Sequence, residues 1–429
     1  MRVFLRTLAL SGMTTAALAA QAHAAGFYLQ EQSVRGTGRA YSGEVADQGV
    51  ESLWWNPAAI ARSPREAYVG ASAILAPSRV ENTGSTITYP GGVTRPVGGE
   101  VAAYNPIQNG VVPNLAVSTP IGDRFAVGVS LTAPFNLTTK YGQQSWVRYD
   151  ALRSRLTTAD LQLTGAMKVT DWLDLGVGFD AQRTEAKLQN ALPNLSPTLP
   201  DGITQLSGNG WNYGWTVGAQ AHFDRLSLGA SYRSAMDHNL SGKVFVGGLL
   251  GPLAVGNIDA PGSATFATPW IATMGARYRV TDRLTLDGQV QRYGWSKFRN
   301  IEVTTRGVTQ ALPQGYKDTT SGGVGADYEV NKRLTLRAGV QYDPTPTPSA
   351  ARSPRVPDGN RWLYAVGATG RVNDRMQVDA SFSCIDFANS SVNHATTFFP
   401  GTPAAITTAL HGSVKGEGYV MAVGLRTQF

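Results

Sequence analysis

The sequence predicts an all-β protein, a 14-stranded antiparallel transmembrane β-barrel with an N-terminal, partly helical plug. Three observations predict this fold: an export signal, a polar turn that recurs six times before an alternating strand, and a last strand that ends in an aromatic residue. An exported chain that has no long apolar helix can span a second membrane only with strands closed into a barrel.

Residues 1–24 have the features of a secretory signal peptide. Two arginines precede an apolar stretch from Leu8 to Ala20, and a small-x-small cleavage site ends at Ala24. The apolar stretch is shorter than the roughly 20 residues of a spanning helix, which argues against a membrane anchor. We expect the mature chain to start near Ala25 and to reside in the outer membrane of a Gram-negative cell.

The composition is unusual for a soluble enzyme. The chain has 48 glycines, 16 tyrosines, nine tryptophans and only 16% charged residues. Its one cysteine, Cys384, permits no internal disulfide and lies too far from the signal peptide to anchor a lipid. These features favour a β-barrel or a periplasmic β protein.

A repeated turn decides between those two classes. In each copy a polar reverse turn precedes a strand in which apolar and polar residues alternate, and the copies lie at residues 122–125, 170–173, 223–226, 281–284, 331–334 and 373–376. After the second turn, for example, Leu173, Leu175 and Val177 alternate with Asp174 and Gly176. About ten alternating residues is the length of a tilted strand that crosses a bilayer.

The turns also count the strands. Six turns join twelve strands, and one strand must precede the first hairpin and one must follow the last, which gives fourteen. The opposite connections are long and rich in Gly, Pro, Thr and Asn, at residues 77–110, 137–152, 189–210, 235–263, 298–317, 344–360 and 389–413. Short turns on the periplasmic side and long loops outside are typical of bacterial outer-membrane barrels, and a soluble β-sandwich would not explain them.

Aromatic residues mark the predicted membrane interfaces. The last strand carries Tyr419, Met421 and Val423 on one face and ends at Phe429. A second group is expected to form interfacial girdles, and it comprises Trp172, Trp211, Trp270, Trp295 and Trp362.

Residues 25–64 do not follow the strand pattern, and residues 65–429 form the predicted barrel. Asn56 is placed to cap a helix whose first position is Pro57. A barrel of fourteen strands is too wide for its own side chains to fill. The segment is therefore interpreted as a plug, or hatch, inside the barrel, and a periplasmic tail is the alternative.

The same segment resembles the FadL family of outer-membrane fatty-acid and hydrocarbon transporters. The resemblance lies in Ala25-Gly26-Phe27, in the stretch 36–44 and in Asn56-Pro57-Ala58, and it extends over residues 112–128 and more loosely over the barrel. It implies a hydrophobic ligand pocket near the hatch, with Phe27, Asn56, Pro57 and Ala58 as hatch or ligand-binding residues. It also implies that substrate leaves sideways through a defect in the third strand.

The third strand contains residues that fit such a defect. Gly128, Ser130 and Pro134 lie in the stretch 125–134. Because proline has no N–H to donate to the strand ladder, a carbonyl opposite it loses its partner. The alternative is that Pro134, ten residues past the turn, already lies at the outer rim.

The predicted substrate is a long-chain fatty acid or a similar hydrophobic molecule, taken up passively. A carboxylate head group requires a cation, and Arg183 and Lys187, before a long loop, are candidates that the resemblance also favours. Either charge could instead be solvated or bind lipopolysaccharide. Aromatic hydrocarbons, or general diffusion through a porin, remain alternative functions.

Other classes of function lack support in the sequence. The four histidines after residue 25 are scattered and none accompanies a nucleophile motif, so we expect no enzyme. No paired Cys and His spacing predicts a metal, no cofactor is expected, and the basic residues form no nucleic-acid patch. The expected partners are the hydrophobic substrate and the surrounding outer-membrane lipid and lipopolysaccharide, with the barrel as a monomer.

Overall fold

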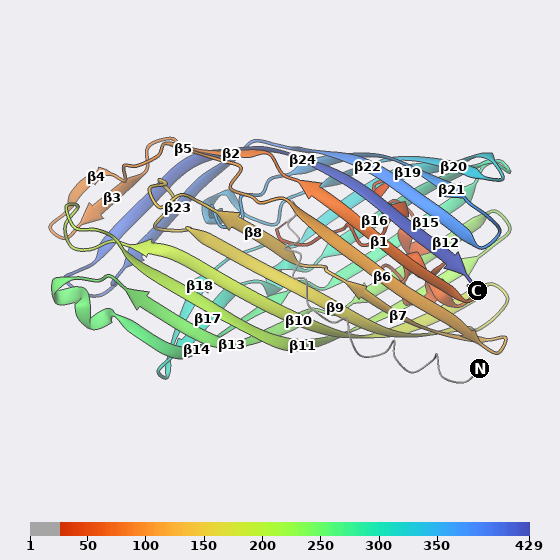
Figure 1. Ribbon diagram of the computed structural model, residues 1–429, viewed down its shortest axis with the longest axis horizontal. Coiled ribbons are helices and arrows are strands. Elements are labelled where there is room, and N and C mark those ends of the chain that lie inside the picture. The colour runs from red at the N-terminus through yellow and green to blue at the C-terminus, as the bar shows by residue number, and fades with distance from the viewer. Residues whose placement is uncertain (1–25) are drawn as a thin grey trace, which may run out of the picture.

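The computed structural model describes residues 26–429, so the predicted signal peptide and Ala25 lie outside the described residues. The described chain is an all-β, closed antiparallel barrel of 14 wall strands, as predicted (Figure 1). The barrel closes where β24 (Ile406–Gln428) pairs with β1 (Glu66–Leu75), with Glu66 opposite Gln428. No helix among residues 26–429 is long and apolar enough to cross a membrane.

Several wall strands are interrupted and consist of two strand segments. The first wall strand is β1 with its extension β2 (Ser78–Asn82). The other thirteen wall strands follow in chain order, and two segments joined by 'with' belong to one wall strand: β5 (Ala102–Tyr104) with β6 (Gly110–Ile121), β7 (Phe125–Thr132) with β8 (Asn136–Lys140), β9 (Arg153–Lys168), β10 (Leu173–Leu192), β11 (Gly202–His222), β12 (Leu226–Arg233) with β13 (Met236–Gly247), β14 (Ile258–Thr268) with β15 (Ile271–Arg279), β16 (Leu284–Tyr293) with β17 (Asn300–Thr305), β18 (Val308–Pro313) with β19 (Thr319–Asn331), β20 (Leu334–Asp343), β21 (Arg361–Arg371), β22 (Met376–Phe387) with β23 (Ser390–Phe398), and β24. A small hairpin of β3 (Thr86–Tyr89) and β4 (Val93–Pro96) lies in the first outer loop.

All six predicted turns join neighbouring wall strands, and the predicted alternation is confirmed. Along β10 the side chains of Asp174 and Asp180 are buried in the lumen, whereas Val177 and Phe179 are 60% and 49% exposed on the outer wall. The apolar residues are the exposed ones because this outer surface is the part of a barrel that contacts lipid.

The predicted long loops are shorter in the structure. Strands continue through much of residues 189–210, 235–263, 298–317 and 389–413, and between β17 and β18 only two residues remain. The reason is that neighbouring strands keep pairing beyond the apolar belt, for example β10 with β11 up to Leu192 opposite Gly202. Turn-forming residues in these stretches were interpreted as loop, but ladder hydrogen bonds hold them in strands.

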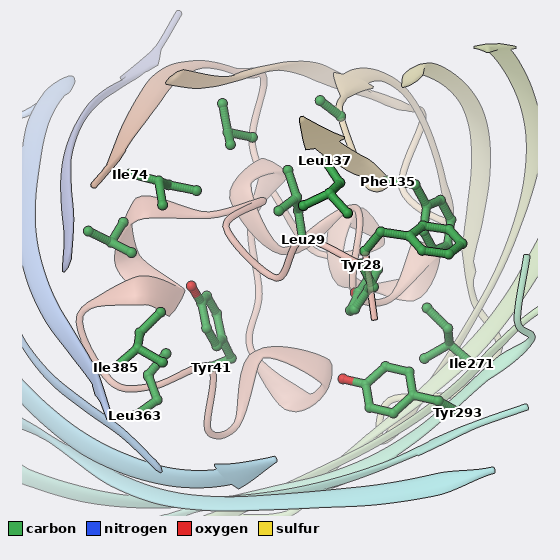
Figure 2. Close-up of a cluster of buried hydrophobic side chains, with 14 of the residues drawn as sticks. Tyr28, Leu29, Tyr41, Ile74, Phe135, Leu137, Ile271, Tyr293, Leu363 and Ile385 are labelled. Carbon is green, nitrogen blue, oxygen red and sulfur yellow. The ribbon is translucent and has the colours of Figure 1, made fainter. Parts of the chain in front are cut away.

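Residues 26–64, here called the hatch, lie inside the barrel at the end where Phe429 lies (Figures 1 and 2). The hatch contains one turn of α-helix, α1 (Val34–Thr37), and three 3-10 turns, η1 (Glu44–Ala46), η2 (Val50–Ser52) and η3 (Pro57–Ile60). Nearly every hatch residue is buried. The remaining 3-10 turns, η4 (Gly251–Gly256), η5 (Trp295–Lys297) and η6 (Ser349–Ala351), lie outside the hatch.

Glycines of the wall allow the hatch backbone to approach the strands. A Cβ on Gly176 of β10 would lie 2.3 Å from the carbonyl carbon of Pro57, and one on Gly218 of β11 would lie 2.0 Å from Asn56 Oδ1. No Cβ fits at such distances, so η3 packs against the wall only because these positions lack a side chain. The polar lumen face of the strands is therefore shaped to receive the hatch.

Gly176→Ala is expected to destabilise the packed hatch. The new methyl group would displace the Pro57 backbone, and such overpacking costs about 1–3 kcal/mol. Gly288→Ala is the matched control, because a Cβ there meets no atom within 4 Å. The temperature at which the purified barrel unfolds should fall for Gly176→Ala and should not fall for Gly288→Ala; equal temperatures for the two variants would contradict this role of the wall glycine.

Candidate functional site

An apolar cavity lies in the lumen beside the first described residues of the hatch. Its volume is about 90 Å³, several times the roughly 10–15 Å³ that one water requires. The apolar lining comes from the hatch, seven wall strands and two loops, and its members are Phe27, Leu137, Leu156, Ala186, Leu188, Leu206, Leu240, Ala264, Phe266, Phe298, Ile301 and Val356. Polar groups are few, and they are contributed by Ser154, Arg155, Gln314 and Arg355. The lining favours an apolar ligand that carries one polar end.

Phe27, which lines this cavity, belongs to a group of packed aromatic rings. Its ring contacts those of Trp295, Phe298 and Phe135 edge to face, with centroids 5.0, 5.1 and 6.0 Å apart. The prediction that Trp295 belongs to an interfacial girdle is therefore wrong, because this ring is fully buried. The break between β16 and β17 turns it into the lumen, and periodicity could not predict that break.

The same hatch segment binds the third wall strand where that strand is interrupted. β7 ends at Thr132 and β8 begins at Asn136. The N–H of Leu29 donates to the Pro134 carbonyl at 2.7 Å, and the N–H of Asn136 donates to the Phe27 carbonyl at 3.1 Å. Residues 27–29 thus act as a short strand that pairs with the interruption from inside the barrel.

The wall ladder between the second and third strands stops at this interruption. β6 and β7 pair continuously from Ile121 opposite Phe125 to Leu115 opposite Leu131. Beyond that point residues 110–114 keep their pairing with β1 but have no ladder partners in residues 132–136. We call this place the wall gap.

Hatch side chains occupy the hydrogen-bonding positions at the wall gap. Gln32 accepts from the N–H of Ala133 and donates to its carbonyl, both at 3.2 Å, so that its amide replaces a strand partner. On the other side of the gap, Asn114 of β6 donates to the Glu31 carbonyl at 2.9 Å. No sequence pattern had singled out Gln32, which lies in a segment without periodicity.

The three residues predicted to mark the opening have different places in the structure. Pro134 lies in the wall gap, whereas Gly128 and Ser130 lie in the intact ladder opposite Ser118 and Ala116. The interruption is thus moved from Gly128 and Ser130 to residues 132–136. Gly128 instead provides space for the hatch, because a Cβ there would lie 2.9 Å from Ile60 Cδ1.

The guanidinium of Arg355 lies at the polar side of the cavity, in the loop between β20 and β21. It donates to Ser154 at 3.3 Å and to Asn190 at 3.1 Å, and its Nε lies 3.5 Å from an Asp150 oxygen. Burial lowers the pKa of Arg355, and Asp150 only partly reverses this effect. An anionic ligand at this position would therefore gain a cation whose charge is incompletely compensated.

Arg183 and Lys187, the predicted head-group cations, do not line the cavity. They project from the outer face of β10, where Arg183 donates to Asn209 at 2.6 Å and lies over the ring of Trp211. The parity of β10 decides this, because even-numbered residues face the lumen and odd-numbered ones face outward. Arg355 was missed because the sequence gives no sign that its loop folds back over the lumen.

Asn56, Pro57 and Ala58 hold the hatch to the wall and do not line the cavity. Asn56 Oδ1 accepts from the N–H of Ala58, and Pro57 is the first residue of η3, as the sequence predicted. Asn56 Nδ2 also donates to the carbonyls of Val45 and Ala219 at 2.7 and 3.0 Å. One side chain thus caps η3, joins two parts of the hatch and binds β11.

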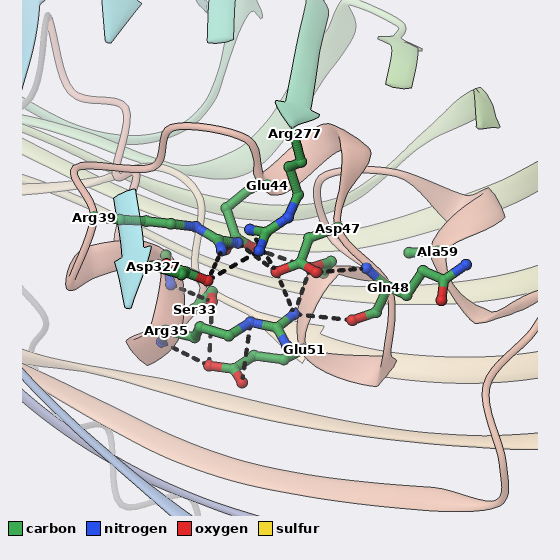
Figure 3. Close-up of polar contacts among 12 residues, drawn as sticks. Ser33, Arg35, Arg39, Glu44, Asp47, Gln48, Glu51, Ala59, Arg277 and Asp327 are labelled. Atoms are coloured by element: carbon green, nitrogen blue, oxygen red, sulfur yellow. Dashed lines mark hydrogen bonds and ion pairs between the residues drawn. The ribbon is translucent and has the colours of Figure 1, made fainter. Parts of the chain in front are cut away.

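An ionic cluster fixes the middle of the hatch to wall strands β15 and β19 (Figure 3). The fully buried Arg39 pairs with Glu44, with Asp47 at 2.5 Å and with Asp327 of β19 at 3.1 Å. Arg277 of β15 pairs with the same Asp47 and Asp327 at 3.2 and 2.9 Å. Since removing one partner of a buried pair is costly, the cluster disfavours movement of this part of the hatch. Among the described residues no group of three His, Cys, Asp or Glu side chains is suited to a metal ion.

Asn56→Ala should loosen the hatch while leaving the barrel assembled. It removes a cap worth about 1 kcal/mol and one of the two side-chain donors to the Val45 carbonyl, the other being Gln220. Trypsin added to the purified barrel should cut the hatch at Arg62 faster than in the parent protein. Asn373→Ala is the control, because Asn373 makes the same kind of cap at an exposed turn. Equal cleavage in both variants would show that Asn56 does not hold the hatch.

The chain is similar in sequence to one family model and to curated outer-membrane proteins. The family model "Outer membrane protein transport protein (OMPP1/FadL/TodX)" matches residues 15–429. The long-chain fatty acid transport protein of Escherichia coli K12 is 28% identical over 422 residues, which cover 89% of this chain and 92% of that protein. Outer membrane protein P1 of Haemophilus influenzae is 26% identical over 419 residues, which cover 89% and 90%.

Solved structures share the fold. A FadL homologue from Pseudomonas aeruginosa superposes with a TM-score of 0.83 at 24% identity, and the match covers 94% of this chain and 100% of that protein's chain. The toluene transporter TbuX of Ralstonia pickettii superposes with a TM-score of 0.67 at 18% identity, over 92% and 98%. Because the family model extends over the whole described barrel and hatch, the chain belongs to the OMPP1/FadL/TodX family of outer-membrane transport proteins.

Proposed function

We propose that this protein binds a long-chain fatty acid or a similar amphiphile in the luminal cavity and passively releases it sideways through the wall gap. The observation that carries the proposal is that one hatch segment touches both places. Phe27 lines the cavity with its ring, and its own carbonyl binds the third strand at Asn136.

The cavity supplies the affinity for an apolar chain. Burial of each CH₂ group stabilises the bound state by about 0.8 kcal/mol. The present volume of about 90 Å³ accommodates only part of a long chain, so the remainder needs additional space. Displacement of the Phe27 ring would provide it, because this ring lines the cavity.

The polar side of the cavity favours an anionic head group over a neutral hydrocarbon. Arg355 presents a charged donor there, and a hydrogen bond to a charged group contributes about 1.5–3 kcal/mol. A carboxylate can accept from this guanidinium while its chain lies among Leu188, Leu206 and Leu240. An aromatic hydrocarbon would use the apolar lining without this contact.

Movement of residues 27–29 would connect binding to release. A ligand that displaces Phe27 pulls on the backbone that pairs with Pro134 and Asn136. Gln32, three residues beyond Leu29, is the next contact along the same segment. Loss of its two hydrogen bonds with Ala133 would leave the wall gap without its inner cover.

The wall gap is the favourable exit for an oily molecule, because it faces the lipid and lipopolysaccharide that would surround the barrel. A chain that left through the periplasmic end would enter water and lose the burial of every CH₂ group. A chain that passes between residues 110–114 and 132–136 enters the hydrocarbon region directly. This route needs no energy source other than partitioning.

A general diffusion porin fits less well. Its lumen must be open to water, whereas the hatch side chains that cross this lumen are almost entirely buried. Binding in the lumen and release through the wall gap both use residues of a single barrel, so the proposed transporter acts as a monomer.

Arg355→Gln should weaken binding of a long-chain fatty acid by roughly tenfold or more, because a charged hydrogen bond is lost. Binding of the corresponding long-chain alcohol should change little. Arg95→Gln, on the exposed hairpin strand β4, removes the same charge away from the cavity and is the control. Titration calorimetry with both ligands measures the difference. If the acid and the alcohol weaken equally, Arg355 only supports the loop; if neither changes, the cavity prefers neutral ligands.

A disulfide across the wall gap should stop release. The next register positions beyond Leu115 and Leu131 are Asn114 and Thr132, so Asn114→Cys with Thr132→Cys is tested in a Cys384→Ser background. Oxidised protein should take up little fatty acid, and reduction should restore uptake. Formation of the bridge is verified by mass, since it requires Cα atoms within about 7 Å.

The control for this disulfide is the pair Ala116→Cys and Ser130→Cys. These residues are already ladder partners, so a bridge between them should leave uptake unchanged. Normal uptake by protein that is fully oxidised at Asn114→Cys and Thr132→Cys would show that the substrate leaves by another route.

A further inference from the structure

A second concave region is lined by outward-facing residues of β9, β10, β11 and β13. These strands are neighbours in the barrel wall (Figure 1). The region has a volume of about 420 Å³, and it is separate from the function proposed for the lumen. Four cations line it, Arg153, Arg155, Lys187 and Lys243, together with the single acid Glu185. Four positive charges and one negative charge give this depression a net charge of +3.

The strand register brings the cations into one row. Lys187 of β10 lies opposite Arg155 of β9 and opposite Ser207 of β11, and Ser207 in turn lies opposite Lys243 of β13. Like charges directly opposite each other on a sheet are destabilising. The row therefore has a cost in the isolated protein that an anion placed over it would remove.

Partners within the protein compensate this charge only in small part. Lys243 has Asp259 of β14 at 4.0 Å, and Arg155 donates to the neutral Thr157 at 3.1 Å. No ion pair within 4.0 Å is recorded for Arg153, Arg155 or Lys187 among the described residues. The surplus charge thus faces outward from the wall.

The surface next to this depression indicates what kind of anion it meets. Towards the periplasmic end, the same strands expose Leu163 of β9, Phe179 of β10 and Trp215 of β11, which are 51%, 49% and 50% exposed. These three residues lie in one row of the ladder. They belong to an apolar belt of the sort that contacts lipid chains.

Aromatic and cationic groups lie between the belt and the depression. Trp211 is 54% exposed, and the guanidinium of Arg183 lies 5.9 Å from its ring centroid. Lys187 follows Arg183 by four residues, which is about 13 Å along a strand and about 10 Å along the membrane normal at the usual tilt. The cationic row therefore lies just outside the interface, at the level of lipid headgroups.

We propose that this depression binds the phosphorylated sugar headgroup of a lipopolysaccharide molecule whose acyl chains lie on the apolar belt of β9, β10 and β11. The inference rests on the outer-membrane location of the barrel and is independent of the luminal cavity. Lysine and arginine side chains of the row bind the phosphates, Asn209 and Ser207 supply hydrogen-bonding groups for the sugar, and the belt holds the chains. A free anion would use the cations but would have no need of the adjoining apolar belt.

The test compares two triple variants with the same change of charge. Arg153→Gln, Lys187→Gln and Lys243→Gln together remove three of the four cations and leave Arg155, which also lines the luminal cavity. Arg283→Gln, Lys332→Gln and Arg375→Gln together remove three exposed cations at periplasmic turns. Native mass spectrometry of the full barrel in detergent, titrated with bisphosphorylated lipid A, gives the dissociation constant for each protein.

Loss of these three cations should weaken lipid A binding by about tenfold or more, because each cation near an anionic lipid surface contributes severalfold. The control triple variant should bind lipid A as the parent does. Dephosphorylated lipid A should bind the parent weakly, and millimolar inorganic phosphate should not displace the lipid.

Three outcomes would overturn the proposal: equal loss in both triple variants, undiminished binding without the three cations of the depression, or displacement of lipid A by inorganic phosphate. Heat-dependent electrophoretic mobility checks that each variant is a folded barrel. Fatty-acid binding by the variant that lacks Arg153, Lys187 and Lys243 should match that of the parent, because none of the three lines the luminal cavity. A change in lipid A binding alone therefore distinguishes this site from the function proposed for the lumen.

Discussion

Backbone hydrogen bonding in a medium without water is the constraint on which this structure depends. A strand in a bilayer must pair on both sides, and closure of β24 onto β1 satisfies the last open edge. Fourteen strands make a barrel too wide for its own side chains to fill. The lumen therefore requires a separate segment, and the hatch can pack closely because wall glycines such as Gly176 and Gly218 leave room for its backbone.

The same need for backbone hydrogen bonds explains how the interruption of the third strand is stabilised. Proline at position 134 removes a donor from the ladder, and the pairing of β6 with the third strand stops at Leu115. Backbone groups of the third strand that lack a ladder partner find one in the hatch. The N–H of Leu29 donates to the Pro134 carbonyl, and the amide of Gln32 pairs with the N–H and the carbonyl of Ala133. The stability of this place in the wall thus depends on a segment that is not part of the wall.

Features of the sequence that act locally predicted the fold well. Each polar turn specifies its own hairpin, and alternation assigns each side chain of β10 to the lumen or the outer wall. The cap formed by Asn56 was equally local. The lengths of the outer loops were predicted less well, because pairing beyond the membrane depends on the neighbouring strand and not on the residues of the loop alone.

The candidate site was harder to predict because its parts meet only in three dimensions. Trp295 was assigned to a girdle, since nothing near it in sequence shows that the break after β16 turns its ring towards Phe27. Arg355 reaches the cavity from a loop about 330 residues after Phe27. Arg183 and Lys187 occur at the expected height on β10, but a shift of one residue in parity decides whether a cation faces the ligand or the membrane.

The proposed release requires that residues 27–32 move while the middle of the hatch stays in place, and the strengths of their contacts differ in that direction. Arg39 and Asp47 in the middle of the hatch form ion pairs with each other and with Arg277 of β15 and Asp327 of β19, and loss of one partner of a buried pair costs about 3–5 kcal/mol. Residues 27–32 are held to the third strand by neutral hydrogen bonds, each with a net contribution of about 1 kcal/mol. An acyl chain gains about 0.8 kcal/mol for each CH₂ group that it buries. About five such groups would offset the four hydrogen bonds that hold residues 27–32 to the third strand. Displacement of the middle of the hatch would break its two ion pairs with β15 and β19, at about 3–5 kcal/mol each, which is more than the four hydrogen bonds contribute. The proposed release at the wall gap would therefore leave the middle of the hatch in place.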